Sequence, residues 1–369
     1  MKFCLILGTR PEIIKFSPVI RELEKRKLDF FVIHTGQHYS YEMDKIFFEE
    51  LNLPTVKYNL QVGSGNHGVQ TGKMLEGIEN ILLKEKPDVV LVQGDTNSVL
   101  AGALAASKLH IKVAHVEAGL RSFDRRMPEE ANRILADQIS DFLFAPTGIS
   151  LQNLKNENIT QVDLIGLNGK FKQKAYDVGN TIVDATRQNL ELARKNKMSI
   201  LKSIGVESGK YVLLTSHRAE NVDNIDFLKN LCNLIDYIKT KHDLTVVWPI
   251  HPRTVKKLAE FDMTPNAKLI DPLGYLEFLV LESSSKINVT DSGGVQEESC
   301  ILGIPAITIR VSTDRPETVK VGANEIAGVT LNGMKTAFDK MQKSSKKWKI
   351  PYKENASTQI INLLIENIH

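Results

Sequence analysis

The stretch Ile6-Leu7-Gly8-Thr9-Arg10-Pro11-Glu12-Ile13-Ile14-Lys15 decides how the chain begins to fold. It joins an expected strand, residues 3–7, to an expected amphipathic helix, residues 12–26. Proline suits the first helical turn, where its missing N–H forfeits no hydrogen bond, and Gly8 lets the backbone turn sharply and approach a ligand closely. A helix N-terminus beside Arg10 and Lys15 suits a phosphate ester. The alternative is an ordinary strand–helix turn with basic surface residues.

Short apolar runs alternate with helical patterns along the rest of the chain, which is typical of parallel sheets flanked by helices. The expected strands are residues 3–7, 30–34, 89–93, 112–116 and 142–145 in the first half, and 211–215, 245–249, 268–270, 287–290 and 306–309 in the second. We therefore expect an α/β fold with two Rossmann-like, doubly wound lobes and a ligand cleft between them. The lobes are expected at residues 1–179 and 180–350, and residues 351–369 as a C-terminal helix that packs back on the first lobe. The polar residues 156–175 indicate an exposed loop or hairpin.

The composition argues against several classes of protein. The chain has 369 residues, 42% of them hydrophobic, and a net charge of only +3, which suits a globular protein of about two domains rather than a nucleic-acid binder. No apolar run reaches the ~18 residues of a membrane span, and no signal peptide is visible. Cys4, Cys232 and Cys300 form no CxxC pair, and the histidines are dispersed, so we expect no disulfide framework and no metal. We expect a cytoplasmic protein without a nucleic-acid or membrane partner; GxGxxG is absent after the first strand, which argues against a bound dinucleotide.

Acidic residues follow the expected strands of the first half. Asp95 and Glu117 each come directly after a strand, and Glu129 and Glu130 open a helix behind Pro128. Carboxylates that converge on one crevice push one another's pKa values apart, so that one serves as an acid and another as a base. The alternatives are a helix N-cap for Asp95 and simple helix-end charges for the glutamate pair. Glu117 closes an apolar strand and needs a partner.

Two segments of the second half suit a nucleotide diphosphate. His217 and Arg218 follow the strand 211–215; both donate hydrogen bonds, and the imidazole can also pass a proton. Two glycines follow Ser292 after the strand 287–290 and open a helix, which makes a cradle of backbone N–H groups for phosphate. Glu298, one helical turn on, can accept two ribose hydroxyls. The alternatives are a structural histidine and a plain helix N-cap with acidic residues behind it.

Taken together, these segments resemble the non-hydrolysing UDP-N-acetylglucosamine 2-epimerases. Seven segments match in order from Gly8 to Arg315, including Asp271-Pro272-Leu273-Gly274-Tyr275-Leu276-Glu277-Phe278, Thr313-Asp314-Arg315-Pro316-Glu317 and Pro249-Ile250-His251-Pro252-Arg253. Ala219 and Arg253 depart from the family, which usually has arginine and asparagine there. The resemblance implies a fold of the glycosyltransferase-B type, a homodimer, no cofactor and a small-molecule UDP-sugar substrate.

The resemblance also implies a role for each matching residue. The catalytic residues it implies are Asp95, Glu117, Glu129 and His217. The substrate-binding residues it implies are Arg10, Lys15, Leu273, Phe278, Ser292, Gly293, Gly294, Glu298 and Arg315. Among these, the Ser292 loop binds phosphate and Glu298 ribose, while the segment of Leu273 and Phe278 faces uracil.

The implied reaction interconverts UDP-N-acetylglucosamine (UDP-GlcNAc) and UDP-N-acetylmannosamine (UDP-ManNAc). Expelling UDP from C1 builds oxocarbenium character, which makes the C2 hydrogen acidic. A carboxylate then takes that proton to give 2-acetamidoglucal, another acid returns a proton to the opposite face, and UDP adds again. Three alternatives stay open: a related UDP-diacetamido-uronic acid as substrate, a UDP-sugar glycosyltransferase on the same architecture, and a non-catalytic nucleotide-sugar sensor.

Overall fold

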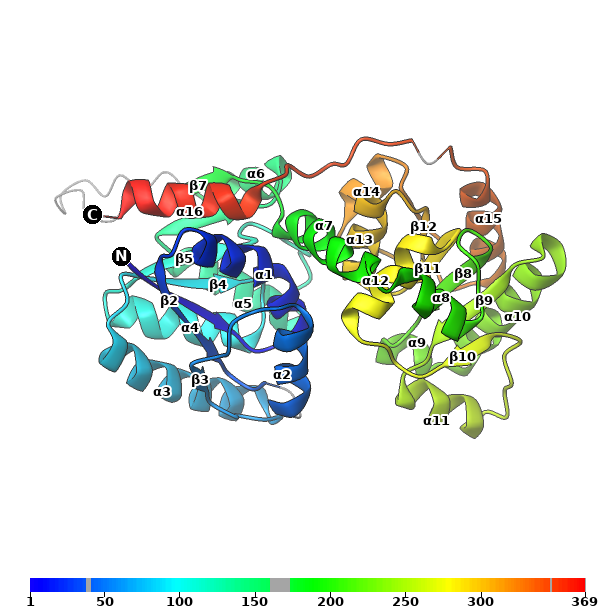
Figure 1. Ribbon diagram of the computed structural model, residues 1–369, viewed down its shortest axis with the longest axis horizontal. Helices are drawn as coiled ribbons and strands as arrows, with labels where there is room; N and C mark the ends of the chain where they lie inside the picture. The colour runs from blue at the N-terminus through cyan, green and yellow to red at the C-terminus, as the bar shows by residue number, and fades with distance from the viewer. Residues whose placement is uncertain (38–40, 160–172, 346, 369) are drawn as a thin grey trace. The chain divides into compact units, whose positions relative to one another are not determined.

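The computed structural model describes residues 1–37, 41–159, 173–345 and 347–368. They form two units that divide within helix α7 (Thr181–Arg194). Unit 1 comprises Met1–Ala185 and Tyr352–His369, and unit 2 comprises Thr186–Pro351 (Figure 1). Within the described ranges, no helix is long and apolar enough to cross a membrane.

Unit 1 is built on a seven-stranded parallel sheet in the order β3-β2-β1-β4-β5-β6-β7. Its strands are β1 (Lys2–Leu7), β2 (Asp29–His34), β3 (Tyr58–Asn59), β4 (Val89–Gln93), β5 (Lys112–Val116), β6 (Phe142–Ala145) and β7 (Lys174–Asp177). Its helices are α1 (Arg10–Lys25), α2 (Tyr41–Glu50), α3 (His67–Glu85), α4 (Asn97–Lys108), α5 (Pro128–Ile139), α6 (Gly148–Asn156) and α16 (Ala356–Asn367), with the start of α7. The strand order reverses between β1 and β4, and ligands of doubly wound sheets bind at such a switch point.

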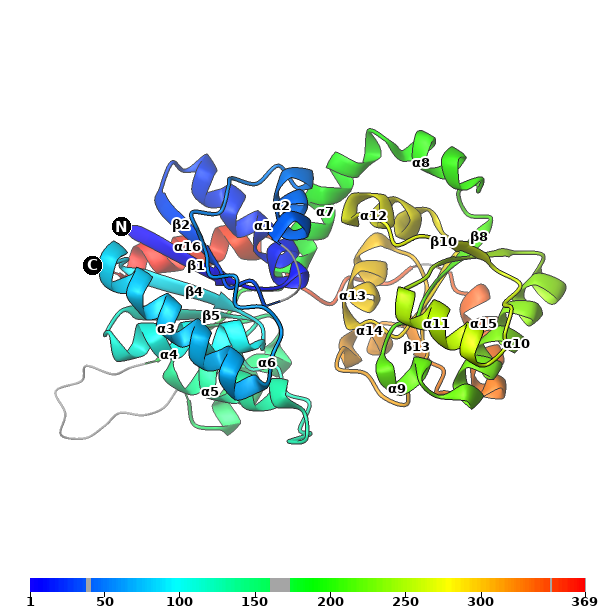
Figure 2. The same ribbon diagram turned by 90° about the horizontal axis from the view of Figure 1, so that it is seen from below.

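Successive side chains of each strand point to opposite faces of this sheet, so helices pack against both faces. Cys4 and Ile6 of β1 pack with Met74 and Ile78 of α3, and with α4, on one face. Figure 2 shows α3, α4 and α5 on that face and α1 and α16 on the other. The first sheet is thus buried on both sides, which is why its central strands are almost continuously apolar.

Helix α16 returns from unit 2 and packs on α1. Asp184 of α7 holds its start: the carboxylate accepts the backbone N–H groups of Asn355 and Ser357, both at 2.9 Å, and the Ser357 hydroxyl at 2.7 Å. The side chain of Arg26, at the end of α1, donates a hydrogen bond to Asn362 in the middle of α16 at 2.6 Å. The last helix is therefore an integral part of unit 1.

Unit 2 repeats the architecture with a six-stranded parallel sheet in the order β10-β9-β8-β11-β12-β13. Its strands are β8 (Tyr211–Thr215), β9 (Thr245–Pro249), β10 (Lys268–Ile270), β11 (Ile287–Thr290), β12 (Ala306–Thr308) and β13 (Asn324–Ile326). Its helices are α8 (Lys197–Ile204), α9 (Ala219–Val222), α10 (Ile225–His242), α11 (Pro252–Glu260), α12 (Tyr275–Ser284), α13 (Gly293–Leu302), α14 (Pro316–Lys320) and α15 (Leu331–Gln342). Its switch point lies between β8 and β11.

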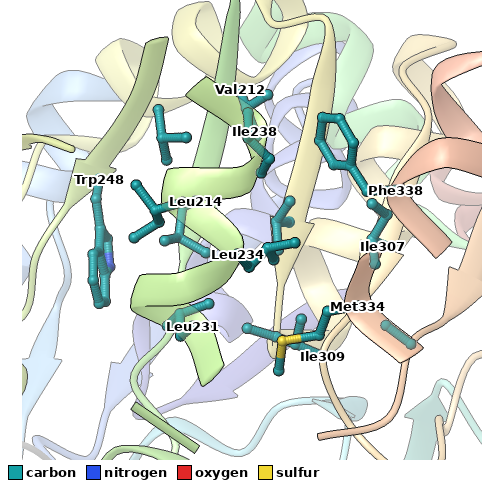
Figure 3. Close-up of a cluster of buried hydrophobic side chains, with 14 of the residues drawn as sticks. Val212, Leu214, Leu231, Leu234, Ile238, Trp248, Ile307, Ile309, Met334 and Phe338 are labelled. Carbon is teal, nitrogen blue, oxygen red and sulfur yellow. The ribbon is translucent and has the colours of Figure 1, made fainter. Parts of the chain in front are cut away.

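The core of unit 2 shows the same two-faced pattern. Val212 and Leu214 of β8 point toward α10 and α15, where Leu234 and Phe338 lie (Figure 3). Tyr211 and Leu213 of the same strand pack instead with residues of α8 and α12. The expected α/β fold with two doubly wound lobes is confirmed.

All ten expected strands are present, whereas β3, β7 and β13 were not expected. The expected loop at residues 156–175 lies partly outside the described residues, namely at 160–172. The expectation was wrong at its two ends, because Asn156 ends α6, Ile159 is buried, and Lys174 begins β7, which pairs with β6.

Candidate active site

The turn after β1 is held by a buried glutamate. Glu12 Oε2 accepts hydrogen bonds from the Gly8 N–H and the Thr9 hydroxyl, both at 2.8 Å, and Oε1 accepts from the Thr96 hydroxyl at 2.7 Å. Burial raises the pKa of Glu12 to about 7, although these hydrogen bonds oppose the shift. Glu12 therefore ties the turn after β1 to the turn after β4, across the switch point. The sequence did not predict this role of Glu12. The signal available was an acidic residue in the first helical turn, directly ahead of apolar residues.

Within unit 1, the neighbours of Gly8 leave no room for a side chain. A Cβ at this position would lie 2.1 Å from Thr35 Oγ1 and 2.2 Å from Ser98 Oγ. The turn after β2 and the first turn of α4 thus press against the turn after β1, and only glycine leaves them room.

The two cations of the opening stretch have partners within unit 1. The Arg10 guanidinium lies 5.1 Å from the centre of the Phe47 ring, an arrangement that is favourable for a cation. Lys15 Nζ lies 2.6 Å from Glu117 Oε1, and only 13% of the lysine side chain and 4% of the glutamate side chain are exposed. Lys15, which we expected to bind the phosphate, thus forms an ion pair with Glu117, one of the expected acid–base residues.

Glu117 follows β5 with a left-handed backbone, φ +67°, a conformation that non-glycine residues seldom adopt outside special sites. Its side chain lies against the turn that precedes Asp95, because a Cβ on Gly94 would be 3.6 Å from Glu117 Oε2. The structure therefore brings Glu117 and the turn of Asp95 to the same edge of the sheet.

Asp95 is partly exposed and forms an ion pair with Arg133 of α5. The alternative reading of Asp95 as a helix N-cap is wrong, because Thr96 caps α4 and accepts from the Val99 N–H. Asn132 also donates to the Asp95 carbonyl, at 3.0 Å. The first two turns of α5 thus position the Asp95 turn.

The neighbouring glutamates of α5 have different surroundings. Glu130 is 1% exposed; it accepts the N–H groups of Ser122 and Phe123 and the Ser122 hydroxyl at 2.9–3.0 Å, and it lies 3.1 Å from Arg133. Burial would raise the pKa of Glu130, but these hydrogen bonds outweigh it and lower the pKa. Glu129 is exposed on the first turn of the helix. Glu130 is thus engaged in holding a loop, and Glu129 is the member of the pair that is accessible.

A fully buried network fixes the loop behind Glu117. His115 Nδ1 lies 2.6 Å from Asp137 Oδ1, while Arg121 Nη1 lies 2.7 Å from Asp137 Oδ2, which also accepts the Gly119 N–H at 3.0 Å. Burial alone would lower the pKa of His115, but the facing Asp137 carboxylate raises it. These residues escaped the sequence analysis because their partners lie far apart in the chain.

In unit 2, Asp291 organises the turn after β8. This fully buried carboxylate accepts the N–H groups of His217 and Arg218, both at 3.1 Å, as well as the Ser216 hydroxyl at 3.0 Å and the Asn221 amide at 3.1 Å. The His217 imidazole lies 3.3 Å from Asp291 and is 53% exposed. Asp291 therefore presents His217 and Arg218 at the switch point, a role that the sequence analysis did not assign to it.

The expected phosphate loop lies beside this turn and has room for a ligand. A Cβ on Gly293 would lie 3.4 Å from Asp314 Oδ1, and one on Gly294 would lie 3.9 Å from Ser292 Oγ, so crowding within unit 2 does not account for these glycines. Ser292 is the N-cap of α13, but its hydroxyl makes no capping hydrogen bond. The backbone there is thus open to an anion at a helix N-terminus.

Three arginines surround Asp314 next to this loop. Burial would raise the pKa of Asp314, but Arg315, Arg310 and Arg218 lower it strongly. The Arg315 side chain, 12% exposed, lies with Nε 3.0 Å from Glu297 Oε2. Arg315, which we expected to bind the diphosphate or the sugar, therefore forms an ion pair within unit 2. Arg310 is a second cation beside Asp314, and its sequence context gave it no expected role.

Glu298 is buried, and it accepts the Tyr275 hydroxyl at 2.7 Å. Leu273, just ahead of α12, and Phe278, in its second turn, are partly buried against the core cluster beneath that helix. The expected uracil-facing segment thus packs beside Glu298. Among the described residues, no group of three His, Cys, Asp or Glu side chains is placed to hold a metal ion.

Comparisons with known proteins agree on one family. A family model described as UDP-N-acetylglucosamine 2-epimerase matches residues 21–365. A Methanocaldococcus jannaschii protein named UDP-N-acetylglucosamine 2-epimerase is 55% identical over 369 residues, which cover 98% of each chain. The crystal structure of the UDP-GlcNAc 2-epimerase of that organism, in complex with UDP-GlcNAc and UDP, has a TM-score of 0.87 and covers 100% of both chains at 55% identity. A UDP-2,3-diacetamido-2,3-dideoxy-D-glucuronate 2-epimerase of Pseudomonas aeruginosa is 44% identical over 89% of this chain and 88% of its own.

Proposed function

The chain belongs to the UDP-N-acetylglucosamine 2-epimerase family, and on that premise we propose that it interconverts UDP-GlcNAc and UDP-ManNAc by eliminating and re-adding UDP. The observation that carries the proposal is the match to this family over nearly the whole chain. The arrangement of both switch points supports it, since unit 1 gathers carboxylates there and unit 2 gathers anion-binding groups.

Unit 2 stabilises the leaving group in this proposal. When the C1–O bond breaks, its electron pair stays on the UDP phosphate oxygen. The N–H groups of the Ser292 loop, with His217 and Arg315, donate to the diphosphate as that charge develops. Arg10 and Lys15 of unit 1 are expected to add positive charge, and Glu298 binds the ribose while Leu273 and Phe278 contact the uracil.

Unit 1 moves the proton. One carboxylate takes the C2 hydrogen as a proton, and the electron pair of the C2–H bond becomes the C1–C2 double bond of 2-acetamidoglucal. A second group then protonates C2 from the opposite face, and the phosphate oxygen of UDP attacks C1 again. The two faces require two proton-transferring groups, and Asp95, Glu117 and Glu129 supply them. The ammonium of Lys15 favours the carboxylate form of Glu117, which suits a proton acceptor.

Turnover in deuterated water tests the proposal directly. UDP-GlcNAc incubated with the protein alone, without any acceptor, should give UDP-ManNAc that carries deuterium at C2, as followed by NMR. Conversion without label would contradict the proton-transfer route. A lack of conversion until an acceptor is added would favour a glycosyltransferase, and binding without any conversion would favour a sensor.

The Pseudomonas aeruginosa relative supports a second candidate substrate, a UDP-diacetamido-uronic acid. The two substrates differ at C3 and C6, whereas the elimination at C1 and C2 is the same. Rates measured on both sugar nucleotides under the same conditions decide between them. An enzyme for the uronic acid needs a cation to bind the C6 carboxylate, whereas the C6 hydroxyl of UDP-GlcNAc needs none.

We also propose that the protein acts in the cytoplasm as a homodimer and without a cofactor, as the family resemblance implies. The three cysteines are free, which suits a reducing compartment. Light scattering of the purified chain tests the dimer, and cell fractionation tests the compartment.

A further inference from the structure

The imidazole of His115 lies between helix α5 and a turn that carries one of the proposed acid–base groups. His115 is on β5 and is 0% exposed. Its Nε2 lies 2.8 Å from the carbonyl oxygen of Gly94, the residue that precedes Asp95. Its Nδ1 lies 2.6 Å from Oδ1 of Asp137, which is also 0% exposed. Each ring nitrogen is therefore within hydrogen-bond distance of an oxygen.

Both of these oxygens can only accept a hydrogen bond. A backbone carbonyl has no proton to give, so Nε2 of His115 must carry one. Oδ2 of Asp137 faces the Arg121 guanidinium at 2.7 Å and the Gly119 N–H at 3.0 Å, which is the environment of a carboxylate. Nδ1 must then carry a proton as well. A neutral imidazole has a single N–H group, so the two contacts together require that His115 be an imidazolium.

The charges of the buried cluster balance only with this cation. Arg121 also donates from Nε and Nη2 to the two oxygens of Glu157, at 2.7 and 2.6 Å. One guanidinium thus faces two carboxylates, and the imidazolium of His115 supplies the missing positive charge, since an uncompensated buried charge is costly. Burial alone would lower the pKa of His115, but Asp137 and, to a smaller extent, Glu117 raise it.

We propose that His115 is a positioning residue, a buried imidazolium that links the turn of Asp95 to the loop behind Glu117 and so fixes the two acid–base groups relative to each other. One ring N–H holds the carbonyl that precedes Asp95, and the other holds Asp137, whose second oxygen holds the loop behind Glu117. That loop needs such support because the backbone of Glu117 is left-handed. The inference rests on the proposed function, in which these carboxylates are among the groups that exchange a proton with C2.

The protonation state can be read by solid-state ¹⁵N NMR of histidine-labelled protein at about pH 8, where a histidine with the ordinary pKa of about 6.5 is mostly neutral. An imidazolium has two protonated ring nitrogens, whereas a neutral ring has one nitrogen without a proton. We expect a ring with two protonated nitrogens in the wild type that is absent from His115→Gln. His110→Gln, which changes an exposed histidine of the same unit, is the control and should keep that ring. Asp137→Asn removes the facing charge, so the same ring should then show a nitrogen without a proton.

Steady-state kinetics and calorimetry of UDP binding measure the positioning role. His115→Gln cannot hold both acceptors at once, so its kcat on UDP-GlcNAc should fall about a hundredfold, as for a catalytic group displaced by about 1 Å. Its KM and its Kd for UDP should stay within about threefold of the wild type, because the change acts on proton transfer rather than on binding. His110→Gln should match the wild type in all three, and circular dichroism and Tm verify folding. If His115→Gln does not fold, Asp137→Asn supplies the same comparisons.

Two results would overturn the inference: a ring nitrogen of His115 without a proton in the folded wild type, or a folded His115→Gln variant with the kcat of the wild type. A loss of kcat with an equal loss of UDP binding would also contradict it, because it indicates general damage to the site. Failure of the proposed function gives a different result, since the wild type itself would then not convert UDP-GlcNAc. In that case the NMR spectra still report whether His115 is an imidazolium.

Discussion

Glu12 is a buried carboxyl group whose proton links the stability of unit 1 to pH. Its pKa is raised from 4.5 to about 7, so between these values the folded chain holds a proton that the unfolded chain has lost. The free energy of unfolding therefore falls as pH rises from about 4.5 to 7, by about 3 kcal/mol from this group, and is level above that range. In Glu12→Gln, whose amide can accept from Gly8 and donate to Thr96, this slope should disappear. Urea unfolding of both proteins across the range checks it, and parallel slopes would contradict the prediction.

The two glutamates of α5 offer a matched pair of substitutions. Glu129→Gln should abolish epimerisation and leave the Tm unchanged, because the side chain is exposed and is proposed to act on the sugar. Glu130→Gln should lower the free energy of unfolding by about 2 kcal/mol, because it weakens hydrogen bonds to a buried charge. Turnover assays with thermal unfolding decide the matter; a stable, active Glu129→Gln would remove Glu129 from the acid–base group.

At this scale the sequence indicates which residues carry chemistry but not how they pair. Asp95 and Glu117 stand out because each follows an apolar strand. The ion pair of Lys15 with Glu117 joins residues 102 positions apart, and a single sequence contains no signal for such a contact.

At the scale of elements, Asp291 sets the shape of the turn between β8 and α9. It accepts three groups of that turn, two of them the backbone N–H groups of His217 and Arg218, and also the Asn221 amide of α9. Asp291→Asn replaces one accepting oxygen by a donor that faces donors, so the turn should open. We expect the affinity for UDP to fall about tenfold or more, as measured by calorimetry. Asp223→Asn, which changes a more exposed ion pair with Arg253, is the control, and equal losses in both variants would refute the role of Asp291.

The elements in the middle of each sheet could be predicted to the residue. Val89–Gln93 and Ile287–Thr290 are buried along their whole length, and all their residues except Gln93 and Asn288 are apolar or β-branched. The strands β3, β7 and β13 have two to four residues at or near a sheet edge. Such short strands owe their conformation to the neighbouring strand, so their own sequence does not reveal them.

At the scale of the whole molecule, the proposed reaction divides binding and proton transfer between the two units. Asp95→Asn and Glu117→Gln should lose turnover by about a thousandfold or more and still bind UDP within a few-fold of the wild type, because general acid–base groups contribute about 10²–10⁴ in rate. Gly293→Val, which fills the open phosphate loop, should do the reverse and weaken UDP binding first. Calorimetry and initial rates on the same preparations test this division, and loss of UDP binding in both carboxylate variants would refute it.

Unit 1 is discontinuous in the sequence, because all of unit 2 lies between its first part and α16. On a translating ribosome, Asp184 therefore meets its hydrogen-bond partners at Asn355 and Ser357 only after residues 186–351 have been synthesised. Until α16 emerges, the surface of α1 on which α16 packs is uncovered on the nascent chain. Synthesis thus leaves an apolar face of α1 exposed to water until the last helix has been made.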